Sequence, residues 1–202
     1  MTVISRRHLL LGGGAVVLGM VQTRVFAVPP APVPPRPILL QRALGALDRH
    51  RATIRYRDVI GIVDFSQASR VPRFHIVDVM SGRSQSLLVA HGRGSDPDHS
   101  GWLERFSNSP GSQASSAGAY LVGSGYSGKH GRSQRLIGLD CENSNAEARA
   151  IVIHAASYVS QDIALASGKL GRSQGCFAVS QADIGQVLER LGPGRMIYAG
   201  KI

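Results

Sequence analysis

The sequence lacks the features that mark several large classes of protein. It contains only two cysteines, Cys141 and Cys176, which excludes a disulfide-dense scaffold. No internal repeat is visible, which argues against a solenoid. The apolar stretch at residues 9–21 is interrupted by glycine and is shorter than the roughly 20 residues that span a bilayer. A chain of 202 residues with 43% hydrophobic and 18% charged residues is therefore expected to form one globular domain.

The first 27 residues have the pattern of an export signal. Arg6 and Arg7 precede the apolar stretch 9–21, and Val25-Phe26-Ala27 follows at the usual spacing for cleavage. This order is typical of a twin-arginine signal peptide, so we expect residues 1–27 to direct the chain to the periplasm. An uncleaved membrane anchor is the alternative. After cleavage we expect no stable membrane span.

Proline sets the boundary of the predicted domain. Residues 28–37 are mostly proline, which fixes φ and removes N–H donors, so we expect an extended linker. Residues 38–202 are expected to form a single domain that begins with an amphipathic helix at 38–51. We expect this helix to dock on its own domain. The apolar residues that recur at helical spacing are Leu40, Leu44 and Leu47.

From residue 58 onward the pattern changes to short β-rich runs separated by turn residues. The first three runs read as a meander, which argues against a doubly wound sheet. The predicted fold is mainly β, a β-rich α+β domain with a few short helices, one of them at 180–191. We expect strands at residues 59–65, 73–80, 86–90, 116–124, 135–140, 150–153 and 195–199.

The chain is basic, with a formal net charge of +10. Removal of the signal takes away Arg6, Arg7 and Arg24 but no acid, which lowers the charge to +7. A basic surface suggests an anionic polymer as partner, namely nucleic acid, a membrane face or cell-wall glycan with its peptides. Export argues against nucleic acid. A merely soluble basic surface is the alternative.

A long segment at residues 91–113 is rich in Gly, Ser, Asp and Pro and predicts an ordered loop or lid. One interpretation of this segment is a metal site formed by His91, Asp96, Asp98 and His99. The segment lacks the helix or ribbon spacing of metal ligands, so loop hydrogen bonds are the preferred reading for its aspartates. We expect no metal and no other cofactor.

One cysteine lies in a context that favours reactivity. Cys176 follows Ser173-Gln174-Gly175, and a thiol in such a turn needs a base and N–H groups for an oxyanion. Gly175 is the candidate that supplies an N–H group for the oxyanion. His154, which ends the apolar run 150–153 and precedes the cysteine by 22 residues, is the candidate base. A structural disulfide between Cys176 and Cys141 is the alternative.

These residues resemble the L,D-transpeptidases of the YkuD type, whose hallmark is a histidine followed some twenty residues later by Ser-x-Gly-Cys. The resemblance extends from about residue 59 to the C-terminus. Within the family, the chain resembles the subgroup called murein L,D-transpeptidase catalytic domain. It implies a YkuD-like, β-sandwich or barrel-like domain. The further segments that carry it are 89–95 (VAHGRGS), 128–131 (GKHG) and 153–160 (IHAASYVS).

The resemblance also implies an activity. It implies that Cys176 forms a thioester with a peptidoglycan stem peptide, that His154 moves the protons, and that a carbapenem blocks the thiol. The product would be a 1,3 link between L-Ala and diaminopimelate or a 3,3 link between two diaminopimelates. Hydrolysis by an L,D-carboxypeptidase or endopeptidase is the alternative outcome.

Further site residues are expected beside the cysteine and the histidine. The resemblance implies that the backbone carbonyl of Ala155 is the third member of the catalytic triad, which orients His154. It implies that Ser173 supports the loop that carries the cysteine. The chain departs from many relatives at Ala155 and Phe177. The candidate substrate contacts are His91, Lys129, His130, Tyr158, Arg172 and Phe177.

Three other protein classes use part of this pattern. Papain-like and NlpC/P60 hydrolases place the cysteine before the histidine, the reverse of the order here. Sortases need a wider His–Cys gap and an arginine soon after the thiol, whereas Arg195 lies nineteen residues beyond Cys176. A secreted wall-binding module would use the same basic surface without a reactive thiol. The sequence leaves the oligomeric state open.

Overall fold

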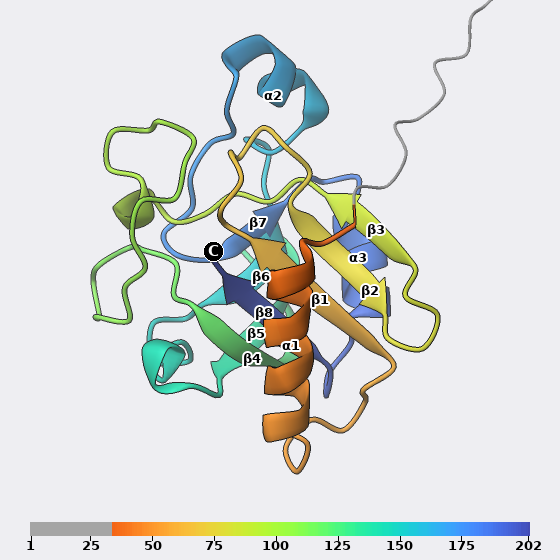
Figure 1. The fold of residues 1–202 in the computed structure, drawn as a ribbon. Helices are drawn as coiled ribbons and strands as arrows, with labels where there is room; N and C mark the ends of the chain where they lie inside the picture. Colours follow the sequence, from red (N-terminus) through yellow and green to blue (C-terminus); the bar gives the residue numbers. More distant parts are fainter. Residues whose placement is uncertain (1–33) are drawn as a thin grey trace, which may run out of the picture. The chain divides into compact units, whose positions relative to one another are not determined.

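The computed structural model describes residues 34–202, whose fold is shown in Figure 1. The predicted signal at residues 1–27 and residues 28–33 of the predicted linker lie outside the described part of the chain. Within residues 34–202, no helix is both long and apolar enough to cross a membrane.

The first helix, α1 (Pro37–Arg49), confirms the predicted N-terminal helix. Proline at its start costs no hydrogen bond, because the first N–H groups of a helix have no partner within it. Its buried face differs from the predicted leucine stripe: Leu44 is exposed, and two alanines, Ala43 and Ala46, lie on the buried face with Leu39 and Leu47. The small alanines allow the helix to approach the sheet closely.

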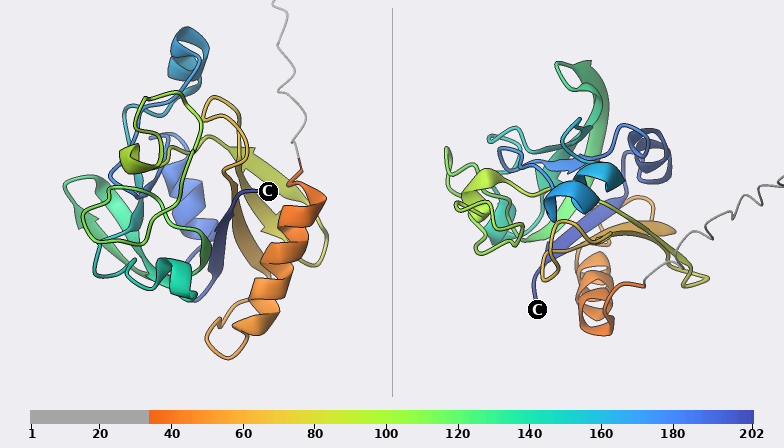
Figure 2. Two further views of the ribbon diagram at one scale, coloured as in Figure 1. Left: turned by 60° about the vertical axis from the view of Figure 1, so that its left-hand side comes forward. Right: turned by 90° about the horizontal axis from the view of Figure 1, so that it is seen from above.

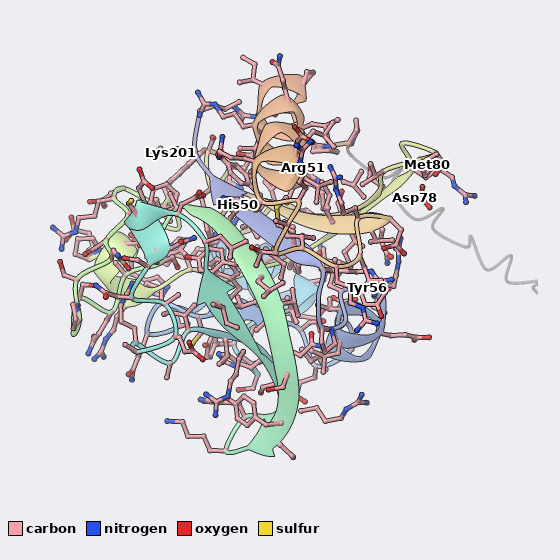
Figure 3. All side chains as sticks on the ribbon, turned by 90° about the horizontal axis from the view of Figure 1, so that it is seen from below. His50, Arg51, Tyr56, Asp78, Met80 and Lys201 are labelled. Atoms are coloured by element: carbon pink, nitrogen blue, oxygen red, sulfur yellow. The ribbon has the colours of Figure 1, made fainter. Side chains whose placement is uncertain are left out.

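Polar contacts fix the same helix to the rest of the domain. His50, just after the helix, bonds Asp140 Oδ1 through Nε2 at 2.8 Å, and Arg42 Nη1 donates to Lys201 O at 3.3 Å. Figure 3 labels His50, which directly follows the last residue of α1. The helix therefore docks on its own domain, as expected.

Eight strands form one mixed sheet in the order β3-β2-β1-β8-β4-β5-β6-β7. The pairs β1–β8 and β6–β7 are parallel and the other neighbours are antiparallel. The strands are β1 (Val59–Asp64), β2 (Phe74–Asp78), β3 (Ser84–Leu87), β4 (Gly118–Gly128), β5 (Gly131–Gly138), β6 (Val152–Ala155), β7 (Phe177–Val179) and β8 (Met196–Gly200).

The two ends of this strand order meet. Just beyond β3, Ala90 forms an antiparallel bridge with Ala178 of β7, and its N–H donates to the Ala178 carbonyl at 2.9 Å. This single bridge joins the segment after β3 to β7, while the eight-stranded sheet itself remains open. The predicted fold class, β-rich with a few short helices, is confirmed.

Alternation along β1 divides the core between the two faces of the sheet. Ile60 and Ile62 point to α1, whereas Val63 joins the larger cluster that includes residues of α3 (Ile184–Arg190). Figure 2 shows α1 and α3 on opposite sides of the sheet. Both faces are thus buried, which explains why β1 is almost continuously apolar.

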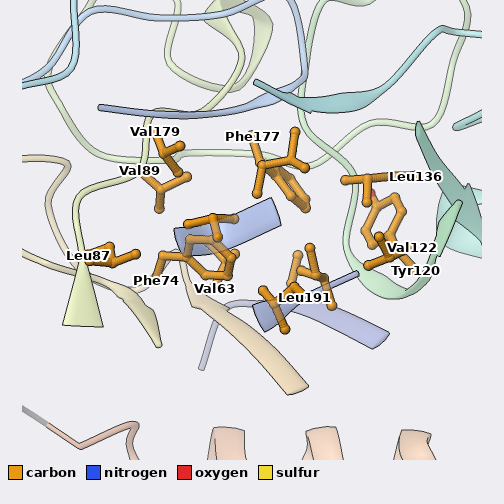
Figure 4. Packing of buried hydrophobic residues seen from close by; sticks show 14 of the residues in the cluster. Val63, Phe74, Leu87, Val89, Tyr120, Val122, Leu136, Phe177, Val179 and Leu191 are labelled. Atoms are coloured by element: carbon orange, nitrogen blue, oxygen red, sulfur yellow. The ribbon is translucent and has the colours of Figure 1, made fainter. Parts of the chain in front are cut away.

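Phe177 belongs to the larger cluster, and Figure 4 shows it among the other core side chains. Its ring is fully buried and lies 5.3 Å from the Tyr120 ring and 5.9 Å from the Phe65 ring, centroid to centroid. We predicted Phe177 as a candidate substrate contact. The structure places it in the core instead, because residues 176 and 177 point to opposite faces of an extended strand.

Four elements differ from the sequence expectation. Helix α2 (Gln161–Ser167), capped by Ser160 Oγ and ended by Gly168 at φ 67°, was not predicted. Strand β7, directly after Cys176, was also not predicted. Finally, β4 and β5 extend through residues 125–134, between the strands predicted at 116–124 and 135–140, and leave only Lys129 and His130 in the turn. Pairing with a partner strand overrides the weak strand propensity of this Gly- and Ser-rich segment.

Candidate active site

The register between β6 and β7 brings the candidate cysteine and histidine to one face of the sheet. His154 pairs with Ala178 in a parallel ladder, so Cys176, two residues earlier, lies level with Val152. Residues two apart in a strand share a face. Cys176, His154 and Val152 accordingly line the same cleft, whose volume is about 370 Å³.

The cleft is lined mainly by basic, aromatic and small polar side chains. Four of the six predicted substrate contacts, Lys129, His130, Tyr158 and Arg172, are among them. None of its lining residues, all within the described range, is acidic, so the cleft is suited to an anionic ligand. The remaining lining residues are Tyr126, Arg149, Ala150, Val152, His154, Ser173, Gln174 and Cys176.

Ser173 shapes the turn that carries the cysteine, as its predicted loop role requires. Its Oγ donates to the Cys176 carbonyl at 2.7 Å and accepts the Gly175 N–H at 3.1 Å. The Gly175 N–H, which we predicted as an oxyanion donor, is therefore already engaged. Gly175 has φ 115°, and a Cβ there would lie 2.8 Å from Ala114 O, so this position requires glycine.

The segment after β3 holds the cysteine loop from the other side. The His91 carbonyl accepts the Ser173 N–H at 2.9 Å. Ser115 Oγ accepts the Gly92 N–H and donates to the Gly175 carbonyl, both at 3.0 Å. A Cβ on Gly92 would lie 2.6 Å from Gly175 N, so the two backbones meet where only glycine fits.

His154 is oriented as a base. Its side chain is almost completely buried, and Nδ1–H donates to the Ala155 carbonyl at 2.8 Å, which leaves Nε2 with its lone pair. Burial lowers the pKa of His154, and the nearby charges of His130 and Lys129 lower it further. The imidazole is thus neutral at neutral pH. The carbonyl of Ala155 occupies the place of the expected third member.

The turn between β4 and β5 covers this histidine. The His130 ring stacks on the His154 ring, with 4.3 Å between centroids and 27° between planes. His130 is exposed on its outer side. A ligand that reaches His154 therefore passes beside His130.

Cys176 is half-buried at the edge of the cleft. Its thiol lies 3.7 Å from the Ala150 carbonyl, to which it donates weakly. Burial raises the pKa of the Cys176 thiol, and the Val152 N–H and the charge of Arg149 oppose this effect. The resting pair consists of a neutral thiol and a neutral imidazole, so the proton moves when a substrate is attacked.

His91, another predicted substrate contact, lies buried outside the cleft. Arg73 Nη2 donates to its Nδ1 at 2.8 Å, and its Nε2–H donates to Asp96 Oδ2 at 3.2 Å. Both ring nitrogens are engaged in these bonds and the ring packs beside Phe65, with 6.1 Å between ring centroids, so the side chain does not reach the cleft. Its contribution is to fix the segment that holds the Cys176 loop.

This buried network makes stability depend on pH. Burial and the charge of Arg73 lower the pKa of His91 from 6.5 to about 4, and Arg172 adds to this effect while Asp96 opposes it. In the unfolded chain His91 binds a proton as the pH falls through 6.5, whereas in the folded chain it does so only at about pH 4. We expect the free energy of unfolding to be unaffected by His91 above pH 6.5 and to fall by about 3 kcal/mol as the pH drops to 4.

Urea unfolding at a series of pH values measures this effect, and His91→Gln is the matched control. Glutamine does not titrate, so the difference between wild type and variant must shrink as the pH falls from 6.5 to 4. A constant difference would contradict a neutral buried His91.

Asp96 and His99, which were also discussed as metal ligands, form hydrogen bonds with the protein. Asp96 Oδ1 accepts the N–H and the hydroxyl of Ser100, and His99 Nε2 donates to Leu170 O at 2.9 Å. Across residues 34–202, no group of three His, Cys, Asp or Glu side chains is arranged to hold a metal ion. Both cysteines are free in the structure, and Cys141 lies exposed outside the cleft at the start of a 3-10 turn, Cys141–Asn143.

Sequence reasoning missed Arg149 and Ala150. Arg149 lies between two alanines in an irregular stretch, and nothing in its local pattern distinguishes it from the other arginines. Ala150 has φ 52°, a left-handed conformation that is unusual for a residue with a side chain. Only the fold brings these two residues to Cys176.

Comparison with known proteins gives three kinds of result. The family model described as L,D-transpeptidase catalytic domain matches residues 36–199. No sequence among curated proteins matches the chain. Several solved structures of L,D-transpeptidases are similar in fold.

An L,D-transpeptidase from Mycobacterium tuberculosis is 15% identical, with a TM-score of 0.43, over 71% of this chain and 57% of that one. L,D-transpeptidase 3 of the same organism is 15% identical, with a TM-score of 0.45, over 71% of this chain and 61% of that one. The L,D-transpeptidase of Xylanimonas cellulosilytica is 16% identical, with a TM-score of 0.42, over 78% and 68%. This chain thus spans less than two thirds of the two mycobacterial chains. Because the family model covers most of its length, the chain belongs to the L,D-transpeptidase catalytic domain family.

Proposed function

We propose that this protein is an exported peptidoglycan L,D-transpeptidase that uses Cys176 as nucleophile and His154 as general acid and base. The observation that carries the proposal is the shared cleft: Cys176 and His154 line it together, and the Nδ1–H bond to Ala155 O leaves His154 Nε2 ready to accept a proton. The periplasm, reached by the twin-arginine route, is the proposed location.

The reaction has two halves. His154 Nε2 takes the proton of the Cys176 thiol, and the sulfur attacks the carbonyl of an L,D peptide bond in a stem peptide. The Cys176 N–H donates to the oxyanion, since the Gly175 N–H is bonded to Ser173. The imidazolium then gives its proton to the leaving amine, and the acyl group remains on sulfur as a thioester.

In the second half, the side-chain amine of a diaminopimelate in another stem attacks the thioester. His154 accepts the proton of this amine and returns it to the Cys176 sulfur as the new amide forms. One amide is broken and one is made, so no nucleotide is required. Water in place of the amine would give the hydrolase as an alternative outcome.

The cleft provides cations for the carboxylates of such a substrate. Lys129 and Arg172 line it, and no acid of the described chain does. Between the two possible cross-links we favour the 1,3 link from L-Ala to diaminopimelate, on the resemblance to the murein subgroup.

Chromatography and mass spectrometry of muropeptides incubated with the mature protein test this function. We expect dimers that contain a 1,3 or 3,3 link, together with the released fragment of the donor stem. Monomers shortened by hydrolysis, without dimers, would assign the protein to the hydrolase alternative. Unchanged muropeptides would contradict both.

A further inference from the structure

Arg149 lies beside the proposed nucleophile without an acidic partner. Its guanidinium lines the cleft that holds Cys176, and a Cβ on Gly175 would lie only 3.3 Å from its Nη2. Among the ion pairs of residues 34–202, none includes Arg149. Partial burial of a cation without a carboxylate partner costs desolvation free energy, and an anion nearby would offset this cost.

The guanidinium is held in place by the loop at residues 107–116. Nη1 donates to Ser107 O at 2.8 Å and to Ser116 Oγ at 3.2 Å. Nη2 donates to Ser112 Oγ at 3.2 Å and to Ala114 O. Both terminal nitrogens thus donate to neutral acceptors. The guanidinium is therefore not free to bind a ligand carboxylate through two parallel hydrogen bonds.

Lys129 and Arg172 also line the cleft and carry a positive charge. Lys129 also lowers the pKa of the Cys176 thiol, but it is exposed at the hairpin turn, where salt screens its charge strongly. Arg172 Nη1 donates to the carbonyls of Asp96 and Pro97, at 3.0 Å for the latter. Arg149 packs against Gly175, the residue before the thiol, and is partly buried, so its charge is screened less than that of Lys129.

We infer that Arg149 is a positioning residue whose fixed positive charge stabilises the thiolate of Cys176. The inference rests on the proposed role of Cys176 as nucleophile. Tyr120 and Cys176 are the two groups whose negative charge would raise the pKa of Arg149. Burial raises the pKa of Tyr120 to about 12, so this phenol stays protonated near neutral pH and the Cys176 thiolate is the relevant anion. Arg149 thereby offsets part of the burial that raises the pKa of the thiol.

The pKa of the Cys176 thiol, measured from the pH dependence of iodoacetamide alkylation, tests this inference. The background is Cys141→Ala, so that only one thiol reacts. In Arg149→Met we expect the thiol pKa to rise by about one unit, because an opposite charge at close range shifts a pKa by about 1 to 3 units. Alkylation at neutral pH should fall about tenfold, since only the thiolate reacts.

Charge and shape are separated by further variants. Arg149→Lys keeps the charge, so its thiol pKa should stay near the wild-type value. Arg83→Met removes the same charge from the exposed turn after β2 and should leave the thiol pKa unchanged. If Arg149→Met does not fold, Arg149→Gln provides a neutral side chain with amide donors for the loop acceptors.

A thiol pKa that stays constant in a folded neutral variant, with only the melting temperature lowered, would overturn the inference and make Arg149 a structural residue. Equal rises in the lysine and neutral variants would overturn it too. Alkylation does not depend on peptidoglycan, so this test can succeed or fail independently of the proposed transpeptidation.

Discussion

Replacing Cys176 with alanine is expected to abolish formation of cross-linked muropeptides and to leave the fold intact. The sulfur is the only atom of the side chain that reacts in the proposed mechanism, and alanine offers no nucleophile in its place. The side chain is half-buried at the edge of the cleft, outside the main hydrophobic clusters. Its loss should therefore change the melting temperature only slightly. Muropeptide analysis together with thermal unfolding measures both effects.

Cys141→Ala is the matched control, because Cys141 is exposed and lies outside the cleft. It should retain wild-type activity. A Cys176→Ala protein that still forms cross-links would contradict the assignment. If the wild-type protein bound cell wall but formed no product, and Cys176→Ala bound equally well, the protein would be a wall-binding module.

Replacing His154 with alanine should lower the rate of cross-linking by about 10³-fold, or about 4 kcal/mol in activation free energy. The variant loses the base that takes the thiol proton and the acid that protonates the leaving amine. Its residual activity should increase with pH more steeply than that of the wild type, because burial raises the pKa of the Cys176 thiol. Initial rates across a pH series measure both changes.

His50→Ala serves as the control for this variant. It removes a histidine that bonds Asp140 outside the cleft, so it should affect stability but not the rate of cross-linking. The double variant Cys176→Ala/His154→Ala should be no less active than Cys176→Ala alone, since the two residues act as one unit. A His154→Ala protein with near wild-type rates would show that another group moves the proton.

The parts of the fold that the sequence predicted are those with strong local patterns. α1 is an amphipathic helix and the strands β1, β2 and β8 are apolar runs bounded by turn residues, and all four were expected within a few residues. The missed elements are short or weakly patterned. β7 has three residues, and its backbone is fixed by parallel pairing with β6, a contact between segments that lie over twenty residues apart.

Some residues of the site could also be predicted from local sequence patterns, and others could not. Cys176 and His154 could be recognised because their spacing carries the family motif, and Ser173 because it shares that motif. Arg149 could not, since its importance depends on the loop 107–116 folding back over it. His91 and Phe177 show the converse: both lie near motif residues in sequence, yet alternation and packing direct their side chains into the interior.

The central claim, that Cys176 carries the acyl group, is tested most directly by intact mass spectrometry and peptide mapping of the protein after incubation with a carbapenem. A carbapenem contains a strained amide, so attack by the thiolate should leave one covalent adduct. We expect a single mass increase that maps to the peptide containing Cys176 and that disappears in Cys176→Ala. An adduct on Cys141, or no adduct on the folded wild-type protein, would contradict the account.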